Sequence, residues 1–84
     1  MIDVRFFAAL RERVGSDSLT VMPPDGVDTV VALVAWLADD NVSVARALEA
    51  TPRYLVAVNE VLSQEQAAVR DGDVVALFPP VTGG

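Results

Sequence analysis

The sequence predicts an α+β domain of two layers, in which one main helix covers one face of a mixed sheet of about four or five strands. Three observations support this fold class. The 84 residues, of which 52% are apolar, are enough for one domain with a modest core. Apolar residues alternate with a period of two near both ends of the chain, which indicates strands. One long stretch near the middle instead has the spacing of an amphipathic helix.

The first quarter of the chain predicts two antiparallel strands with a short helix between them. Residues 2–7 alternate, so that Phe7 faces away from the apolar side of the first strand. Residues 8–14 favour a helix that ends at Gly15, and residues 18–22 alternate again as the second strand. The residues expected on the buried side of the first strand are Ile2, Val4 and Phe6.

The longest helix is predicted over residues 28–38, with Asp28 or Thr29 as its N-cap. Trp36 lies one position off the apolar stripe of this helix, so we expect it at the edge of the core. Residues 42–50 are expected to form a second, short helical segment. The stripe has the i, i+3, i+4, i+7 spacing of one helix face and consists of Val30, Leu33, Val34 and Leu37.

The last part of the chain predicts a strand at residues 53–59, a tight turn with a short return strand at residues 61–62, and a final strand at residues 74–78. Gly72 supplies the positive φ of the turn before the final strand. Two adjacent strands that the long helix separates in sequence can pair in parallel through a right-handed crossover. In that arrangement the first and last strands can be central neighbours, so that the tail leaves from the middle of the sheet.

Composition disfavours several classes of function. The net charge of −6 disfavours nucleic-acid binding and favours a partner with a basic docking face. No apolar run approaches the ~20 residues of a membrane span, and the start of the chain does not resemble a signal peptide. We therefore expect a cytoplasmic protein without a membrane partner. Because the chain has no cysteine and no histidine, we expect neither a metal site nor a self-sufficient active site.

The chain ends on residues 78–84, which read FPPVTGG. Pro79 and Pro80 end the last strand and make the exit extended and stiff. The next four residues reach at most about 14 Å, and glycine passes through narrow channels because it has no Cβ. We therefore expect a folded domain at residues 1–80 and a flexible tail at residues 81–84 that can insert its carboxylate into another protein.

The α-carboxylate of Gly84 is the distinctive reactive group of this sequence, because it is the least hindered acyl group that a protein can present. The chain contains no lysine, so any lysine that accepts this acyl group lies on another protein.

Large apolar side chains are predicted on the uncovered face of the sheet, near the base of the tail. Phe7 and Phe78 should point away from the helix, and Leu62 can join them from the short return strand. We interpret this patch as a partner interface; alternatively, a loop covers one or more of these side chains. For the isolated chain the patch favours weak dimers.

The chain resembles a known family, the small subunits of molybdopterin synthase, which are sulfur carriers with the ubiquitin-like β-grasp fold. The resemblance covers essentially the whole chain, although residues 23–51 carry little of it beyond helix spacing. Its most specific part is the FPPVTGG ending. The motifs that carry the resemblance are residues 4–8 (VRFFA), 10–12 (LRE), 57–59 (AVN), 71–73 (DGD) and 78–84.

The resemblance implies a route for sulfur transfer. In this family an E1-like adenylyltransferase uses ATP and Mg²⁺ to adenylate the terminal carboxylate, here that of Gly84, and a persulfide donor then converts it to a thiocarboxylate. The tail residues Val81, Thr82 and Gly83 would insert into the large subunit of a heterotetrameric synthase. There the sulfur passes to cyclic pyranopterin monophosphate, in a catalytic pocket that belongs to the large subunit. The chain itself would bind no cofactor, because ATP and Mg²⁺ are used by the activating partner.

The resemblance also implies which residues contact the large subunit. Phe7, Leu62 and Phe78 match family positions that dock this subunit, and Pro79 and Pro80 are assigned to the same interface.

Two alternatives are left open by the sequence. A sibling carrier that delivers sulfur for thiamine or cysteine synthesis would have the same tail chemistry, although the Pro-Pro ending favours the molybdopterin branch. A ubiquitin-like interaction module with an inert tail would keep its function without Gly83 and Gly84, whereas a carrier would lose it.

Overall fold

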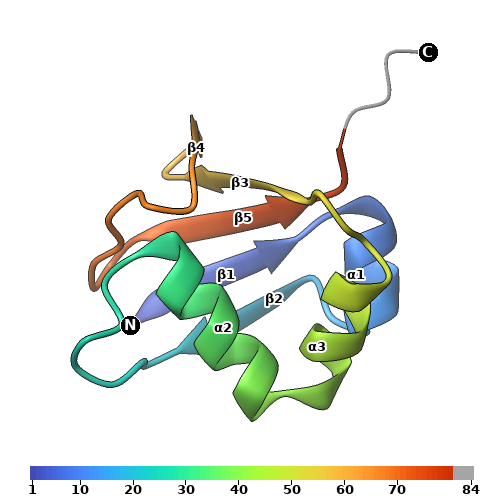
Figure 1. The fold of residues 1–84 in the computed structure, drawn as a ribbon, viewed down its shortest axis with the longest axis horizontal. Coiled ribbons are helices and arrows are strands. Elements are labelled where there is room, and N and C mark those ends of the chain that lie inside the picture. Colours follow the sequence, from blue (N-terminus) through green and yellow to red (C-terminus); the bar gives the residue numbers. More distant parts are fainter. Residues whose placement is uncertain (81–84) are drawn as a thin grey trace.

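A computed structural model describes residues 1–80 of the chain, and every prediction about residues 81–84 lies outside these described residues. Eight elements follow one another, and the order confirms the predicted α+β class (Figure 1). The elements are β1 (Ile2–Phe6), α1 (Ala8–Val14), β2 (Ser18–Val21), α2 (Val30–Asp40), α3 (Val42–Glu49), β3 (Leu55–Val58), β4 (Val61–Ser63) and β5 (Val74–Phe78).

The five strands form one mixed sheet in the order β2-β1-β5-β3-β4. β1 and β5 are parallel central neighbours, as predicted, and every other pair of neighbours is antiparallel. The strands next to the long helix in sequence, β2 and β3, do not pair with each other. Instead α2 and α3 carry the chain from the β2 edge, past β1 and β5, to β3 on the other side (Figure 1).

The long helix α2 forms for the local reasons that the sequence indicates. The Thr29 side chain caps its N-terminus, because Oγ1 accepts a hydrogen bond from the Ala32 N–H at 3.2 Å. Trp36 is half-buried at the edge of the core, as predicted. All four residues of the predicted stripe are buried: Val30, Leu33, Val34 and Leu37.

Two shorter helices complete the layer on the same face of the sheet. α1 ends at Gly15, whose φ of 85° lies in the left-handed region that glycine tolerates. α3 begins at Val42, after its N-cap Asn41, whose side chain accepts hydrogen bonds from N–H groups of the first turn. This helix confirms the predicted second helical segment. Leu10 from α1 and Val44 from α3 belong to the same core cluster as the α2 stripe. The helices therefore share one face of the sheet and leave the other face open.

Candidate docking face and exit strand

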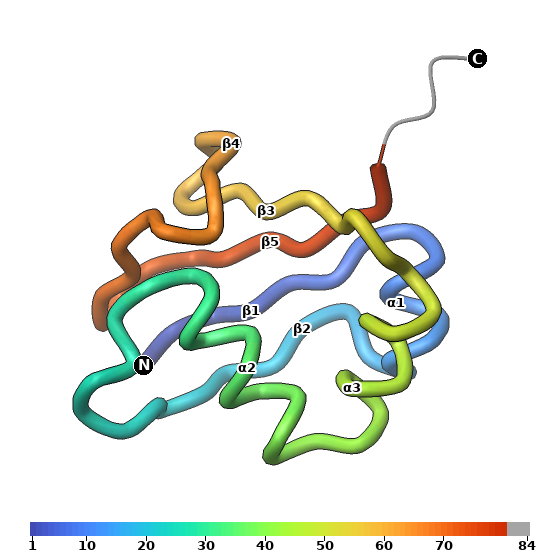
Figure 2. The backbone as a smooth tube through the Cα atoms, in the orientation of Figure 1, coloured from blue at the N-terminus to red at the C-terminus, as the bar shows by residue number. Residues whose placement is uncertain are grey.

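The exit strand β5 lies in the middle of the sheet. Its parallel partner β1 and its antiparallel partner β3 flank it along its whole length (Figure 2). Because β1 and β5 are parallel, both strands start near the N-terminus of the chain and both end at the opposite end of the sheet. Pro79 and Pro80 follow β5 at that end, with Pro79 half-buried and Pro80 exposed. The predicted departure from the middle of the sheet is confirmed up to Pro80.

Neighbouring residues at the ends of β1 and β5 point to opposite faces. Phe6 is 1% exposed in the core, whereas Phe7 is 46% exposed. In the same way Leu77 is fully buried and Phe78 is only half-buried. Side chains alternate along a strand, so Phe7 and Phe78 lie on the face that the helices leave open. Phe78 is paired there with Leu55 of β3, which is also half-buried.

Leu62 lies on the same open face, from the edge strand β4. Leu62 is opposite Ala57, and Ala57 is opposite Ala76, one alternate position before Phe78 on β5. At strand spacings of about 4.8 Å, this register places Leu62 two strands, or roughly 10 Å, across the sheet from β5. Its side chain is 67% exposed.

We call the apolar part of this open face the docking face. The sequence predicted three of its members, Phe7, Leu62 and Phe78. The sheet order adds three more from β3 and β5, Leu55, Ala57 and Ala76. The alternation within residues 53–59 was the available signal for Leu55 and Ala57, but it did not show that these residues lie beside the last strand. The docking face consists of Phe7, Leu55, Ala57, Leu62, Ala76 and Phe78.

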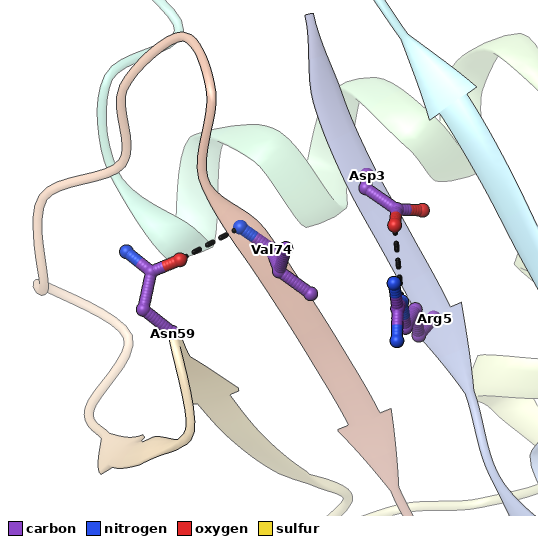
Figure 3. Close-up of polar contacts among 4 residues, drawn as sticks. All are labelled: Asp3, Arg5, Asn59 and Val74. Carbon is purple, nitrogen blue, oxygen red and sulfur yellow. Dashed lines mark hydrogen bonds and ion pairs between the residues drawn. The ribbon is translucent and has the colours of Figure 1, made fainter.

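Charged side chains border the docking face on β1. Arg5 Nε donates a hydrogen bond to Asp3 Oδ2 at 3.0 Å, and both side chains lie along the same strand (Figure 3). A shallow cleft of about 270 Å³ lies between these residues and Phe7, with Arg11 and Asp17 also in its wall. The arginines give this border cationic groups although the chain as a whole is acidic.

A second polar cluster joins two of the family motifs, which are far apart in sequence. Asn59 Oδ1 accepts a hydrogen bond from the Val74 N–H at 2.9 Å (Figure 3). Asn59 Nδ2 donates to Asp73 Oδ1 at 3.0 Å, and Asp73 Oδ2 accepts from the Arg70 N–H at 2.8 Å. The hydrogen bond from Asn59, followed by that from the Arg70 backbone, lowers the pKa of Asp73 below the usual range of an aspartate.

Residues 1–80 contain no group of three or more aspartate or glutamate side chains that could hold a metal ion together. No helix within residues 1–80 is long and apolar enough to cross a membrane. The predicted tail residues Val81, Thr82, Gly83 and Gly84 lie outside the described residues, so their roles stay predictions.

Comparison with known proteins identifies the family. The profile of the ThiS family matches residues 4–84. The chain belongs to the ThiS family. Two curated relatives of this ThiS-family chain are both named molybdopterin synthase sulfur carrier subunit. The Haemophilus influenzae relative is 42% identical and the Escherichia coli relative 45% identical, and each match covers all of both chains.

A solved structure agrees with the fold of this ThiS-family chain. SAMP1 from Haloferax volcanii superposes with a TM-score of 0.76 at 30% identity, over 99% of this chain and 98% of that one. The resemblance drawn from the sequence is therefore confirmed at the level of family and fold.

Proposed function

We propose that this chain is the sulfur carrier subunit of a molybdopterin synthase. The observation that carries the proposal is the match, over the full length of both chains, to two relatives that bear this name. The geometry supports it, because the exit strand ends beside an open apolar face that a partner subunit can cover. The names of these two relatives also favour the molybdopterin branch over a sibling carrier.

The proposed chemistry uses the Gly84 carboxylate. This group is ionised at neutral pH and is a poor electrophile, so it must be activated first. An E1-like adenylyltransferase would attach AMP from ATP with Mg²⁺, releasing pyrophosphate. A persulfide sulfur would then displace AMP, and a thiol would cleave the remaining S–S bond to leave the thiocarboxylate. The proposal includes a cytoplasmic location for the chain, with ATP and Mg²⁺ bound by the activating enzyme.

Sulfur delivery requires the chain to dock on the large subunit. We assign this contact to the docking face, with Phe7, Leu62 and Phe78 as the large apolar groups and with Pro79 and Pro80 directing the tail outward. A reach of about 14 Å lets residues 81–84 enter a pocket in the large subunit. The large subunit would supply the pterin pocket and any general acid or base.

The decisive experiment is intact mass spectrometry after incubation with an E1-like enzyme, ATP, Mg²⁺ and a persulfide donor. We expect a mass gain equal to the exchange of one oxygen for one sulfur. The matched control is the chain without Gly84, which should gain nothing. An unchanged mass of the full chain, under conditions that convert the Escherichia coli relative, would refute the carrier chemistry and leave an interaction module with an inert tail.

A further inference from the structure

The hairpin of β3 and β4 presents Leu62 on its second strand, β4. β4 has three residues and is an edge strand, so β3 is its only neighbour in the sheet that residues 1–80 form. The two residues of the turn, Asn59 and Glu60, have φ values of 49° and 69°. Both values are those of a two-residue hairpin turn of type I′. Leu62 is the second residue after this turn, so the orientation of the turn decides where Leu62 lies.

Two tethers fix the hairpin from opposite sides. After β4, the loop is held to the first turn of α2, since the Val31 N–H donates to the Glu65 carbonyl oxygen at 2.8 Å and the Val30 N–H to that of Ala67 at 2.9 Å. At the turn itself, the Asn59 N–H donates to the Val74 carbonyl oxygen at 2.8 Å.

The Asn59 side chain adds two bonds at the start of β5. Its Oδ1 accepts from the Val74 N–H (Figure 3), and its Nδ2 donates to Asp73 Oδ1. We call these two side-chain bonds the Asn59 clamp.

We propose that Asn59 is a positioning residue for docking: its clamp on the start of β5 holds β4 so that Leu62 lies in one surface with Phe7 and Phe78. The inference rests on the proposed function for the identity of the partner, the large subunit. The clamp lies at the end of β5 remote from the exit, so Asn59 acts through Leu62 and not through the tail.

The chain offers a matched pair of variants in one turn. Asn59→Gly keeps the positive φ at no steric cost and removes the clamp. Glu60→Gly makes the same backbone change at a residue whose side chain makes no hydrogen bond to any residue between 1 and 80. We expect Asn59→Gly to weaken binding to the large subunit roughly fivefold, and Glu60→Gly to leave it unchanged within about twofold. Binding is measured by calorimetry well below the unfolding temperature of each variant.

Double-mutant cycles separate positioning from general stabilisation. If Asn59 acts through Leu62, Asn59→Gly has no further effect on affinity in a Leu62→Ala background but keeps its full effect in a Phe7→Ala background. If Asn59 only stabilises the fold, the unfolding temperature falls while the affinity of the folded protein stays equal to that of Glu60→Gly, and the inference is wrong.

A measurement without any partner tests the structural half of the inference. In the free chain we expect Asn59→Gly to speed hydrogen exchange at the Val61 and Ser63 amides, while the β1–β5 ladder stays protected. Asn59→Asp provides a second variant, because it tolerates the positive φ but cannot donate to Asp73. Unchanged exchange in both variants would overturn the proposal. Failure of the wild-type chain to bind the large subunit would instead count against the proposed function.

Discussion

The Phe7 N–H donates a hydrogen bond to the Leu77 carbonyl oxygen at 3.1 Å. This bond continues the β1–β5 ladder by one residue beyond the end of β1. Phe7 is therefore anchored to the exit strand through its backbone while its side chain remains half-exposed. A side chain held in this way can be replaced without loss of the ladder, and this separates docking from folding in the experiments below.

Phe7→Asp should abolish most of the affinity for the large subunit while the chain stays folded. The substitution replaces an aromatic anchor of the apolar interface with a charged group, and such anchors are worth about 30-fold or more in affinity. The matched control is Val42→Asp, because Val42 is 64% exposed on α3, away from the docking face. Equal affinities of the two variants for the large subunit in a calorimetric titration would show that Phe7 is not part of the interface.

Phe6→Ala and Phe7→Ala should differ sharply in stability although they are neighbours. Phe6 is buried and its truncation should cost about 3–5 kcal/mol in the free energy of unfolding. Phe7→Ala should cost about 1 kcal/mol or less, since its side chain is half-exposed. Urea unfolding followed by circular dichroism measures both, and similar costs would contradict the assigned faces.

Thr29→Ala should lower the free energy of unfolding by about 1 kcal/mol, because the Ala32 N–H loses its cap. Thr29→Ser keeps a hydroxyl at this position and should recover most of the loss. The comparison is made by urea unfolding of the three proteins. A serine variant as unstable as the alanine variant would show that the side-chain oxygen does not act as the cap.

Asp73 should make the protein lose stability in acid. Its pKa is lowered in the folded state, first by the hydrogen bond from Asn59, so the ionised form is favoured by folding. The resulting stabilisation is fully present above the unfolded pKa of about 3.9 and is lost as the pH falls through the folded pKa.

Asp73→Asn tests the predicted loss of stability at low pH, because the amide side chain does not titrate. Between pH 6 and pH 3 the urea midpoint of this variant should fall less than that of the wild-type chain. An identical fall in both proteins would mean that Asp73 does not contribute to the acid sensitivity.

Local patterns predicted the elements well because each pattern is complete within a few residues. The i, i+3, i+4, i+7 stripe of α2 and the alternation of β1 are properties of single segments. In both segments the residues that the pattern marks as apolar are buried in the structure. The end of α2 was less well predicted, since the helix continues to Asp40, two residues beyond the expected end. Helix ends depend on weak signals that extend over several residues.

The sequence by itself determined which side of each strand is apolar, where the long helix is capped, and that Pro79 and Pro80 end the last strand. Only the tertiary structure decided that Leu55 pairs with Phe78, and that Asn59 contacts Asp73, which lies 14 positions further along the chain. The physical reason is the distance along the chain over which each kind of interaction acts. Periodicity and capping act between residues a few positions apart, whereas strand order depends on how the whole apolar surface of the chain is buried at once.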